Sequence, residues 1–161
     1  ELRNSNVFPI TDKRMTRFSI TLEHGVKFVL ECLTKMWGGE LFIPKIPSYR
    51  IIDVGKAISP EAKYKFVGIR PGEKLHEEMI TVNDAFNTIE FDNYFVIIPN
   101  TEFLEWEREE FLNESSRTIG KYCDENFTYS SKTNDKFLTI EEIRDTIIKY
   151  VPGGNVLNVG H

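Results

Sequence analysis

The chain has 161 residues, of which 40% are hydrophobic and 12% aromatic, and its formal net charge is −5 at pH 7. This length and composition are typical of a globular protein with one sizeable core, and they exclude a disordered tail. The acidic balance argues against nonspecific binding to nucleic acid or to a membrane surface, because either would require a basic face. No apolar run approaches the ~20 residues of a membrane span. Cys32 and Cys123 lack the spacing of a zinc site or of a disulfide framework, so we expect a reducing, cytoplasmic setting.

The first third of the chain contains a short cationic segment and then an amphipathic pattern. Residues 8–18 include three cations within five positions, namely Lys13, Arg14 and Arg17. From residue 20 to residue 37 apolar side chains recur at helical spacing, and two glycines follow, which predicts a helix that ends there. Residues 40–44 are apolar and predict a strand. We expect this helix and strand to close a parallel sheet.

The middle of the chain predicts four short elements. Ser48 is a candidate N-cap for a helix over about 49–58 that stops at Pro60. The apolar run 64–69 predicts a strand. Residues 74–81 fit a short helix, and residues 88–99 fit one strand.

Between the expected strand 64–69 and the expected helix 74–81 lies a Pro-Gly turn with charged residues around it. Pro71 fixes φ where a turn needs it, and Gly72 allows a positive φ at the next position. Arg70 then has its planar guanidinium free for bidentate binding of phosphate oxygens. The turn therefore predicts an anion clamp, and the alternative is a surface ion pair between Arg70 and Glu73.

The last third has one clear element. Thr139 and Glu142 form a capping-box pattern that opens a helix over about 140–151. The acidic stretch before it, residues 100–136, has little periodicity, although a short helix over 102–114 fits three aromatic positions. We expect the Gly-rich residues 152–161 to be frayed.

Four ordered blocks of this sequence resemble one enzyme family. They read PITDKRMTRF, GGELFIPKIPS, GIRPGEKLHEEMIT and FDNYFVI, and a looser fifth reads FTYSSKTNDKFLTIEEI. Together they resemble the C-terminal half of the inverting UDP-N-acetylglucosamine 4,6-dehydratases, which are lyases of the extended short-chain dehydrogenase/reductase class in nucleotide-sugar and surface-glycan biosynthesis.

The resemblance implies an α/β fold with two parts. Residues 1–47 would form the end of the nucleotide-binding domain, at the edge of a Rossmann-type parallel sheet. Residues 48–151 would form the small α/β C-terminal substrate-binding region. The resemblance further implies UDP-N-acetylglucosamine as ligand and a homo-oligomeric full-length protein.

Site residues are also implied residue by residue. Arg70 falls on a position that binds the diphosphate, Glu73 on one that binds a ribose or sugar hydroxyl, and Arg17 on another substrate-contacting position. Thr16 and Met15 are further candidates, or they only shape the loop that enters the first helix. His76-Glu77-Glu78 does not match a zinc motif, so we expect no metal site.

Two motifs of the family are missing from this sequence. It has no G-x-x-G-x-x-G turn, and none of its six tyrosines is followed by lysine at Tyr-x-x-x-Lys spacing. We therefore expect the chain to be part of a longer protein whose other half binds NADP and carries the catalytic residues. In that family NADP takes a hydride from C4 of the sugar, water leaves C5/C6, and the hydride returns to C6 with inversion at C5. Alone, the chain should catalyse nothing.

Two alternatives remain. One is a related UDP-sugar 4-epimerase or C5-epimerising dehydratase, because the clamp is shared while the chemistry is decided upstream. The other is a noncatalytic nucleotide-sugar-binding or assembly module. The flanking coding sequence would distinguish them. In the isolated chain we expect apolar faces including Val29, Leu33 and Phe42 to be exposed, so that the chain self-associates or is only marginally stable.

Overall fold

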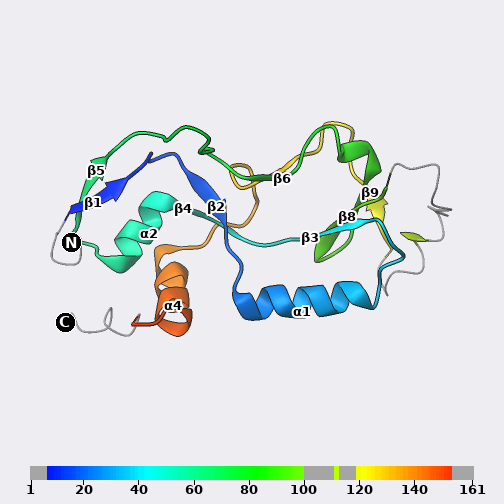
Figure 1. The fold of residues 1–161 in the computed structure, drawn as a ribbon, viewed down its shortest axis with the longest axis horizontal. Coiled ribbons are helices and arrows are strands. Elements are labelled where there is room, and N and C mark those ends of the chain that lie inside the picture. Colours follow the sequence, from blue (N-terminus) through cyan, green and yellow to red (C-terminus); the bar gives the residue numbers. More distant parts are fainter. Residues whose placement is uncertain (1–6, 100–110, 113–118, 154–161) are drawn as a thin grey trace. The chain divides into compact units, whose positions relative to one another are not determined.

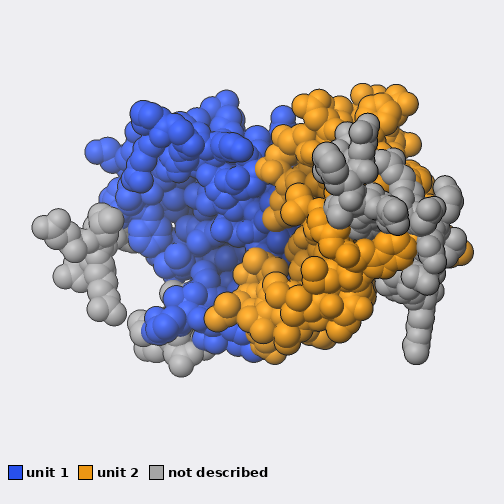
Figure 2. All heavy atoms as spheres, turned by 45° about the vertical axis from the view of Figure 1, so that its right-hand side comes forward, with its two compact units in different colours: residues 1–19, 46–77, 130–161 blue, residues 20–45, 78–129 orange. Residues whose placement is uncertain are grey.

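The computed structural model describes residues 7–99, 111–112 and 119–153. The chain divides into two compact units, which Figure 2 colours blue and orange. Unit 1 comprises residues 1–19, 46–77 and 130–161, and unit 2 comprises residues 20–45 and 78–129. Each unit is thus built from segments that are distant in sequence, so the compact units do not follow the single division at residue 47. The functional assignment of 1–47 and 48–151 remains a prediction.

Unit 1 contains two strand pairs and two helices (Figure 1). Strand β1 (Val7–Ile10) runs parallel to β5 (Lys63–Phe66), with Val7 opposite Lys63. Strand β2 (Thr16–Phe18) runs antiparallel to β4 (Ser48–Arg50). Helices α2 (Ile51–Ile58) and α4 (Ile140–Tyr150) pack against each other.

The ends of these helices test the capping predictions. The box at the start of α4 is confirmed, because the Thr139 side chain accepts from the Glu142 N–H and the Glu142 carboxylate accepts from the Thr139 N–H. Helix α2 ends before Pro60, as predicted, but the assignment of Ser48 as its N-cap was wrong. Ser48 lies in β4, fully buried, and its hydroxyl accepts from the Asn134 amide. The N-cap is Arg50, so the strand extends up to the helix.

The main elements of the described part of unit 2 are helix α1 and an antiparallel sheet. Helix α1 (Leu22–Leu33) begins at Thr21, whose hydroxyl accepts from the His24 N–H. The predicted helix over 20–37 is confirmed in its body and ends earlier. The sheet has the order β3-β8-β7-β9 and is antiparallel throughout, with bounds Leu41–Pro44 (β3), Tyr94–Ile97 (β8), Thr88–Glu90 (β7) and Lys121–Tyr122 (β9). The expectation that strand 40–44 closes a parallel sheet was therefore wrong.

Other boundaries also differ from the sequence prediction. Residues 88–99 form a hairpin and not one strand, because the chain reverses at Asp92 and Asn93 and the Phe91 N–H bonds the Tyr94 carbonyl at 2.9 Å. Residues 74–81 form no helix: they contain β6 (Glu78–Ile80), which pairs with β10 (Tyr129–Ser130). A 3-10 turn at Ala85–Asn87 precedes β7. The helix predicted over 102–114 falls outside the described residues except at 111–112, which are helical.

The core of unit 2 is an aromatic and aliphatic cluster on the sheet. Its buried members are Ile89, Phe91, Tyr94, Val96, Ile98 and Phe111. The rings of Phe91 and Tyr94 stack at 4.9 Å between centroids. Phe42 packs against the cluster and is half-buried, so the expectation that Phe42 is exposed was wrong. None of the described helices is both long and apolar enough to cross a membrane.

Gly120 lies where this core leaves no room for a side chain. A Cβ at this position would lie 2.7 Å from Cγ2 of Ile89 and 2.8 Å from two ring atoms of Phe91. At Gly25, inside α1, the nearest atom would be 3.8 Å away. The two glycines therefore differ in the space around them, although both are in unit 2.

We predict opposite effects of alanine at these two positions. Gly120→Ala should lower the free energy of unfolding by about 1–3 kcal/mol, because overpacking strains a filled core. Gly25→Ala should raise it by about 0.5–1 kcal/mol through helix propensity. Denaturant titrations of the two variants against the unchanged chain measure both effects. Equal effects of the two substitutions would contradict the packing argument.

Helix α1 carries an uncovered apolar face. Val29 is 57% and Leu33 60% exposed, as predicted for both. Residues of this face and the two residues before the helix line an open apolar hollow of about 440 Å³, namely Ile20, Thr21, Leu22, Gly25, Val26, Val29 and Leu30. Contiguous apolar surface of this kind favours association.

We therefore predict that the chain self-associates through α1. Val29→Lys should shift the sedimentation profile toward the monomer, because it places a charge in the apolar face. Glu31→Gln changes the net charge by the same amount on an exposed position of the same helix and serves as the control. If the two variants sediment alike, the association has another cause.

Candidate functional site

The two charged segments singled out in the sequence lie side by side in unit 1. Beyond the parallel pair β1 and β5, the Val67 N–H bonds the Ile10 carbonyl at 2.9 Å and the Gly68 N–H bonds the Thr11 carbonyl at 3.1 Å. The segments meet again where the Thr16 N–H bonds the Leu75 carbonyl at 3.1 Å. Residues 11–16 and 68–75 are thus two loops held together at both ends, and we call them the paired loops.

The second of these loops contains the predicted turn. The Glu73 N–H donates to the Arg70 carbonyl at 3.0 Å, and Gly72 has φ of +81°. With Pro71 before it, this is a type II turn, in which only glycine or asparagine is comfortable at the third position. The turn prediction is therefore confirmed.

The charged side chains at the two ends of the turn do not pair with each other. The Glu73 carboxylate accepts from the backbone N–H of Arg70 at 3.2 Å and so braces the turn. The exposed guanidinium of Arg70 makes no hydrogen bond or ion pair with any residue that the structure describes. The alternative of an Arg70–Glu73 surface ion pair is therefore not what the structure contains.

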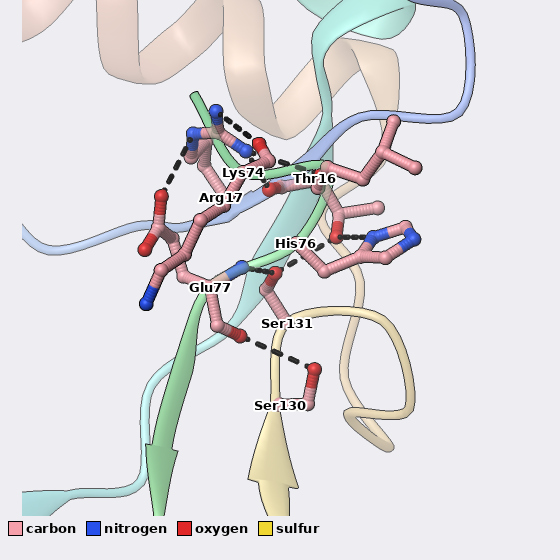
Figure 3. Close-up of polar contacts among 8 residues, drawn as sticks. Thr16, Arg17, Lys74, His76, Glu77, Ser130 and Ser131 are labelled. Carbon is pink, nitrogen blue, oxygen red and sulfur yellow. Dashed lines mark hydrogen bonds and ion pairs between the residues drawn. The ribbon is translucent and has the colours of Figure 1, made fainter. Parts of the chain in front are cut away.

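Arg17 is engaged where Arg70 is free. Its Nη1 donates to the carbonyls of Thr16 at 2.7 Å and Leu75 at 3.2 Å, and its Nη2 donates to the carbonyl of Lys74 at 2.9 Å. Its Nε lies 3.3 Å from Oε1 of Glu77 (Figure 3). Most of the N–H groups of the Arg17 guanidinium are thus directed at backbone carbonyls and at the Glu77 carboxylate of the same chain. This geometry gives Arg17 a role in holding the loop, and contact with substrate remains a prediction.

Thr16 and Met15 are both buried. Met15 is 1% exposed, and its carbonyl accepts from the Ile51 N–H at 3.0 Å. The hydroxyl of Thr16 lies 2.8 Å from Nδ1 of His76 and 2.8 Å from the hydroxyl of Ser131 (Figure 3). These contacts favour the packing role that was the alternative for both residues.

Residues 130–131 complete this arrangement from the far end of the sequence. The Ser131 hydroxyl accepts from the Glu77 N–H at 2.9 Å, and the Ser131 N–H donates to the Glu77 carbonyl at 2.8 Å. The Ser130 hydroxyl donates to the same carbonyl at 3.2 Å. Three segments, 15–17, 74–77 and 130–131, are therefore tied together by polar contacts around Thr16.

The paired loops are basic in an acidic chain. They carry four cations, Lys13, Arg14, Arg70 and Lys74, against the carboxylates of Asp12 and Glu73. Arg14 and Asp12 neutralise each other: Nε and Nη2 of Arg14 lie 2.9 Å and 2.7 Å from the two carboxylate oxygens, and these bonds lower the pKa of Asp12 to about 2. The remaining excess of positive charge suits an anionic ligand.

The pKa of His76 lies below its usual 6.5. Burial is the first cause, and the nearby cations Lys132, Arg17 and Arg14 add to it, while Asp12 opposes them. His76 is thus neutral near pH 7, and either of its ring nitrogens can accept a hydrogen bond in one of the two tautomers.

The described residues contain no metal-binding cluster, and their helix starts lack the glycine turn of a dinucleotide site. No group of three His, Cys, Asp or Glu side chains among them could hold a metal ion. Their helices α1, α2 and α4 begin at Thr21, Arg50 and Thr139, so none starts from the glycine turn that a dinucleotide pyrophosphate requires. Chemically, the unpaired guanidinium of Arg70 is suited to an anionic ligand, and its binding role remains a prediction.

Sequence reasoning missed His76, Ser131 and Glu77 as site residues. Ser131 is 115 positions from Thr16, and no local pattern links the two. The signals that could have indicated them were two of the family blocks: GIRPGEKLHEEMIT contains His76 and Glu77, and FTYSSKTNDKFLTIEEI contains Ser130 and Ser131.

A family model described as polysaccharide biosynthesis protein matches residues 1–99. The chain belongs to this family. Its fold is similar to that of Pen from Bacillus thuringiensis, on which it superposes with a TM-score of 0.68 at 24% identity, covering 91% of this chain and 41% of that one.

Particular relatives narrow the comparison. The chain is 44% and 45% identical to inverting UDP-N-acetylglucosamine 4,6-dehydratases from two strains of Campylobacter jejuni, over 90% and 86% of its length. It is 26% identical to a UDP-glucose 4-epimerase from Rickettsia bellii over 92% of its length. It spans 43%, 41% and 42% of those three proteins.

We predict that Arg17 and Arg14 differ in their contribution to stability. Arg17→Met should lower the free energy of unfolding by about 1–3 kcal/mol, because it leaves backbone carbonyls of the paired loops without a donor. Arg14→Met removes a solvent-exposed ion pair with Asp12 and should have a clearly smaller effect. Urea denaturation compares them. An equal, small cost would mean that water replaces the Arg17 contacts.

Proposed function

We propose that the chain is the substrate-side part of an NADP-dependent UDP-N-acetylglucosamine 4,6-dehydratase that inverts C5. The observation that carries the proposal is the Arg70 guanidinium, presented by a braced type II turn and free of partners among the described residues. The identity of 44–45% to dehydratases of that name supports the substrate class.

Within this proposal, Arg70 grips the diphosphate of the nucleotide sugar. Its planar fork matches two phosphate oxygens, and the basic excess of the paired loops attracts the anion. Glu73 uses one carboxylate oxygen to brace the turn and can accept from a ribose or sugar hydroxyl with the other. We assign Arg17, Thr16 and Met15 supporting roles beneath this surface.

The chemistry itself belongs to residues outside this chain. NADP would supply the redox step by taking and returning a hydride, and none of the helices that the structure describes begins with the glycine turn that would bind it. Holding the diphosphate positions the sugar ring, so that binding energy far from the reacting carbons orients them. The chain alone should therefore be inactive. The same resemblance leads us to propose a cytoplasmic, homo-oligomeric full-length enzyme.

A UDP-sugar 4-epimerase is the second candidate. The 26% identity to UDP-glucose 4-epimerase extends over 92% of the chain, so the same grip would serve that reaction. The product distinguishes the two: a 4-keto-6-deoxy sugar indicates the dehydratase, and a 4-epimer indicates the epimerase.

The test uses a chimera in which the part of the Campylobacter dehydratase that this chain does not span precedes it. The chimera should convert UDP-N-acetylglucosamine with NADP, while the chain alone should not. A folded chimera that binds no nucleotide sugar would support a noncatalytic assembly module and contradict the proposal.

We predict that Arg70→Lys in this chimera weakens UDP-N-acetylglucosamine binding by roughly tenfold or more, because a lysine keeps the charge and loses the bidentate geometry. UMP, which lacks the diphosphate, should bind both proteins alike. Calorimetric titration measures both ligands. If the substitution leaves UDP-sugar affinity unchanged, Arg70 is not the diphosphate ligand.

A further inference from the structure

Thr16, Ser131 and His76 form a continuous chain of polar contacts beneath the paired loops. The Ser131 hydroxyl lies 2.8 Å from the Thr16 hydroxyl, which lies 2.8 Å from Nδ1 of His76 (Figure 3). Ser131 is 0% and Thr16 5% exposed, so solvent does not offer them alternative partners. The direction of each hydrogen bond therefore depends on the three groups and on the Glu77 N–H.

Counting protons along this chain fixes its direction. The Ser131 oxygen already accepts from the Glu77 N–H, and its own hydrogen has the Thr16 oxygen as partner. Thr16 must then donate to Nδ1 of His76, which has to be the unprotonated nitrogen. In the opposite direction Nδ1–H donates to Thr16 and Thr16 donates to Ser131. The buried Ser131 hydrogen is then left without an acceptor among the described residues, which is costly.

We propose that His76 is a positioning residue: as a neutral acceptor in the Nε2–H tautomer it orients Thr16 and Ser131, and through them the 74–77 segment that holds the anion-binding loop. The proposal rests on the proposed function for its ligand, but the orientation of the hydrogen bonds does not.

The charged groups around His76 also favour its neutral form. The segment 130–133 contributes Lys132, strand β2 contributes Arg17, and the loop before it contributes Arg14, all of which disfavour a second proton on the ring. Asp12 is the one acidic group among these neighbours, and it is neutralised by Arg14. A nucleotide diphosphate in contact with the ring would have the opposite effect and favour the protonated form of His76.

Protonation of His76 at Nδ1 should break the hydrogen bond that this nitrogen accepts from the Thr16 hydroxyl. Because its folded pKa is below 6.5, the folded protein holds fewer protons than the unfolded one between that pKa and about 6.5. Its contribution to stability is therefore complete above about pH 6.5 and is lost as the pH falls through the folded pKa. Nucleotide-sugar affinity should fall in the same range, by about tenfold if one hydrogen bond of the loop is lost.

The first test needs no ligand. The chain has three histidines, so long-range ¹H–¹⁵N NMR can resolve each ring. His76 should show an unprotonated Nδ1, a protonated Nε2 and a titration midpoint below 6.5. Thr16→Val should allow both tautomers and move the midpoint toward 6.5. An Nδ1–H tautomer, or a midpoint at or above 6.5, would overturn the proposal.

The second test measures UDP-N-acetylglucosamine affinity of the chimera from pH 5 to pH 8. This ligand is suitable because both its phosphates remain ionised over the range. His76→Asn places an amide oxygen where Nδ1 stood and cannot titrate, so it should remove the pH dependence while keeping the affinity of pH 8. His24→Asn is the matched control and should retain the pH dependence.

The outcomes separate this proposal from the proposed function. If the folded chimera binds no UDP-sugar at any pH, the proposed function is wrong, and NMR alone decides the hydrogen-bond chain. If it binds with an affinity that does not change with pH, His76 does not position the loop. If affinity rises as the pH falls, His76 acts as a cation toward the phosphate and the proposal is wrong.

Discussion

The site depends on one constraint, namely that residues 74–77 have no strand or helix of their own to satisfy their backbone. Buried or half-buried carbonyls and N–H groups must find partners. Here the partners are side chains: the Arg17 guanidinium bonds the carbonyls of Lys74 and Leu75, and the Ser131 hydroxyl accepts from the Glu77 N–H. The segments 15–17, 74–77 and 130–131 therefore have to be in place together before the second of the paired loops, residues 68–75, has a fixed position. Each of these contacts lies within unit 1.

This constraint explains why two arginines of the same two motifs have opposite roles. Arg17 lies next to a loop whose carbonyls need hydrogen-bond donors, and its guanidinium donates to the carbonyls of Lys74 and Leu75. Arg70 is at the start of a turn whose hydrogen bonds are supplied by the backbone and by Glu73, so its guanidinium makes no hydrogen bond or ion pair with the described residues. In the proposed function, Arg17 fixes the loop that presents Arg70 to the ligand. A substitution of either residue would then weaken binding, and a stability measurement would tell the two mechanisms apart.

The features of the fold that could be predicted from the sequence are those that depend on residues close together in the chain. The Pro71-Gly72 turn and the Thr139 capping box require residues only three positions apart, and both are present as predicted. The Arg70 prediction depended on the same turn. Tertiary pairing decided the rest. The segment 74–81 has helical spacing, yet its strand β6 pairs with β10, about fifty residues away.

Strand direction and long-range contacts were similarly out of reach. Apolar residues at 40–44 predict a strand but not its partner, and the hairpin of β7 and β8 offered an antiparallel edge. The hydroxyl of Ser131 reaches Thr16 only because the chain returns to unit 1 after residue 129. Periodicity contains no information on such contacts. The family blocks contained some, since one of them includes the two serines.

The distribution of features between the units also bears on mechanism. The free guanidinium and the polar chain that supports it lie in unit 1, whereas the uncovered apolar helix α1 lies in unit 2. The proposed anion binding and the predicted self-association therefore depend on different residues. The contacts described above that brace the Pro71-Gly72 turn and the segment 74–77 all lie within unit 1. If Arg70 binds the diphosphate as proposed, these contacts fix the turn that presents it, so that binding energy far from the reacting carbons can orient the sugar ring.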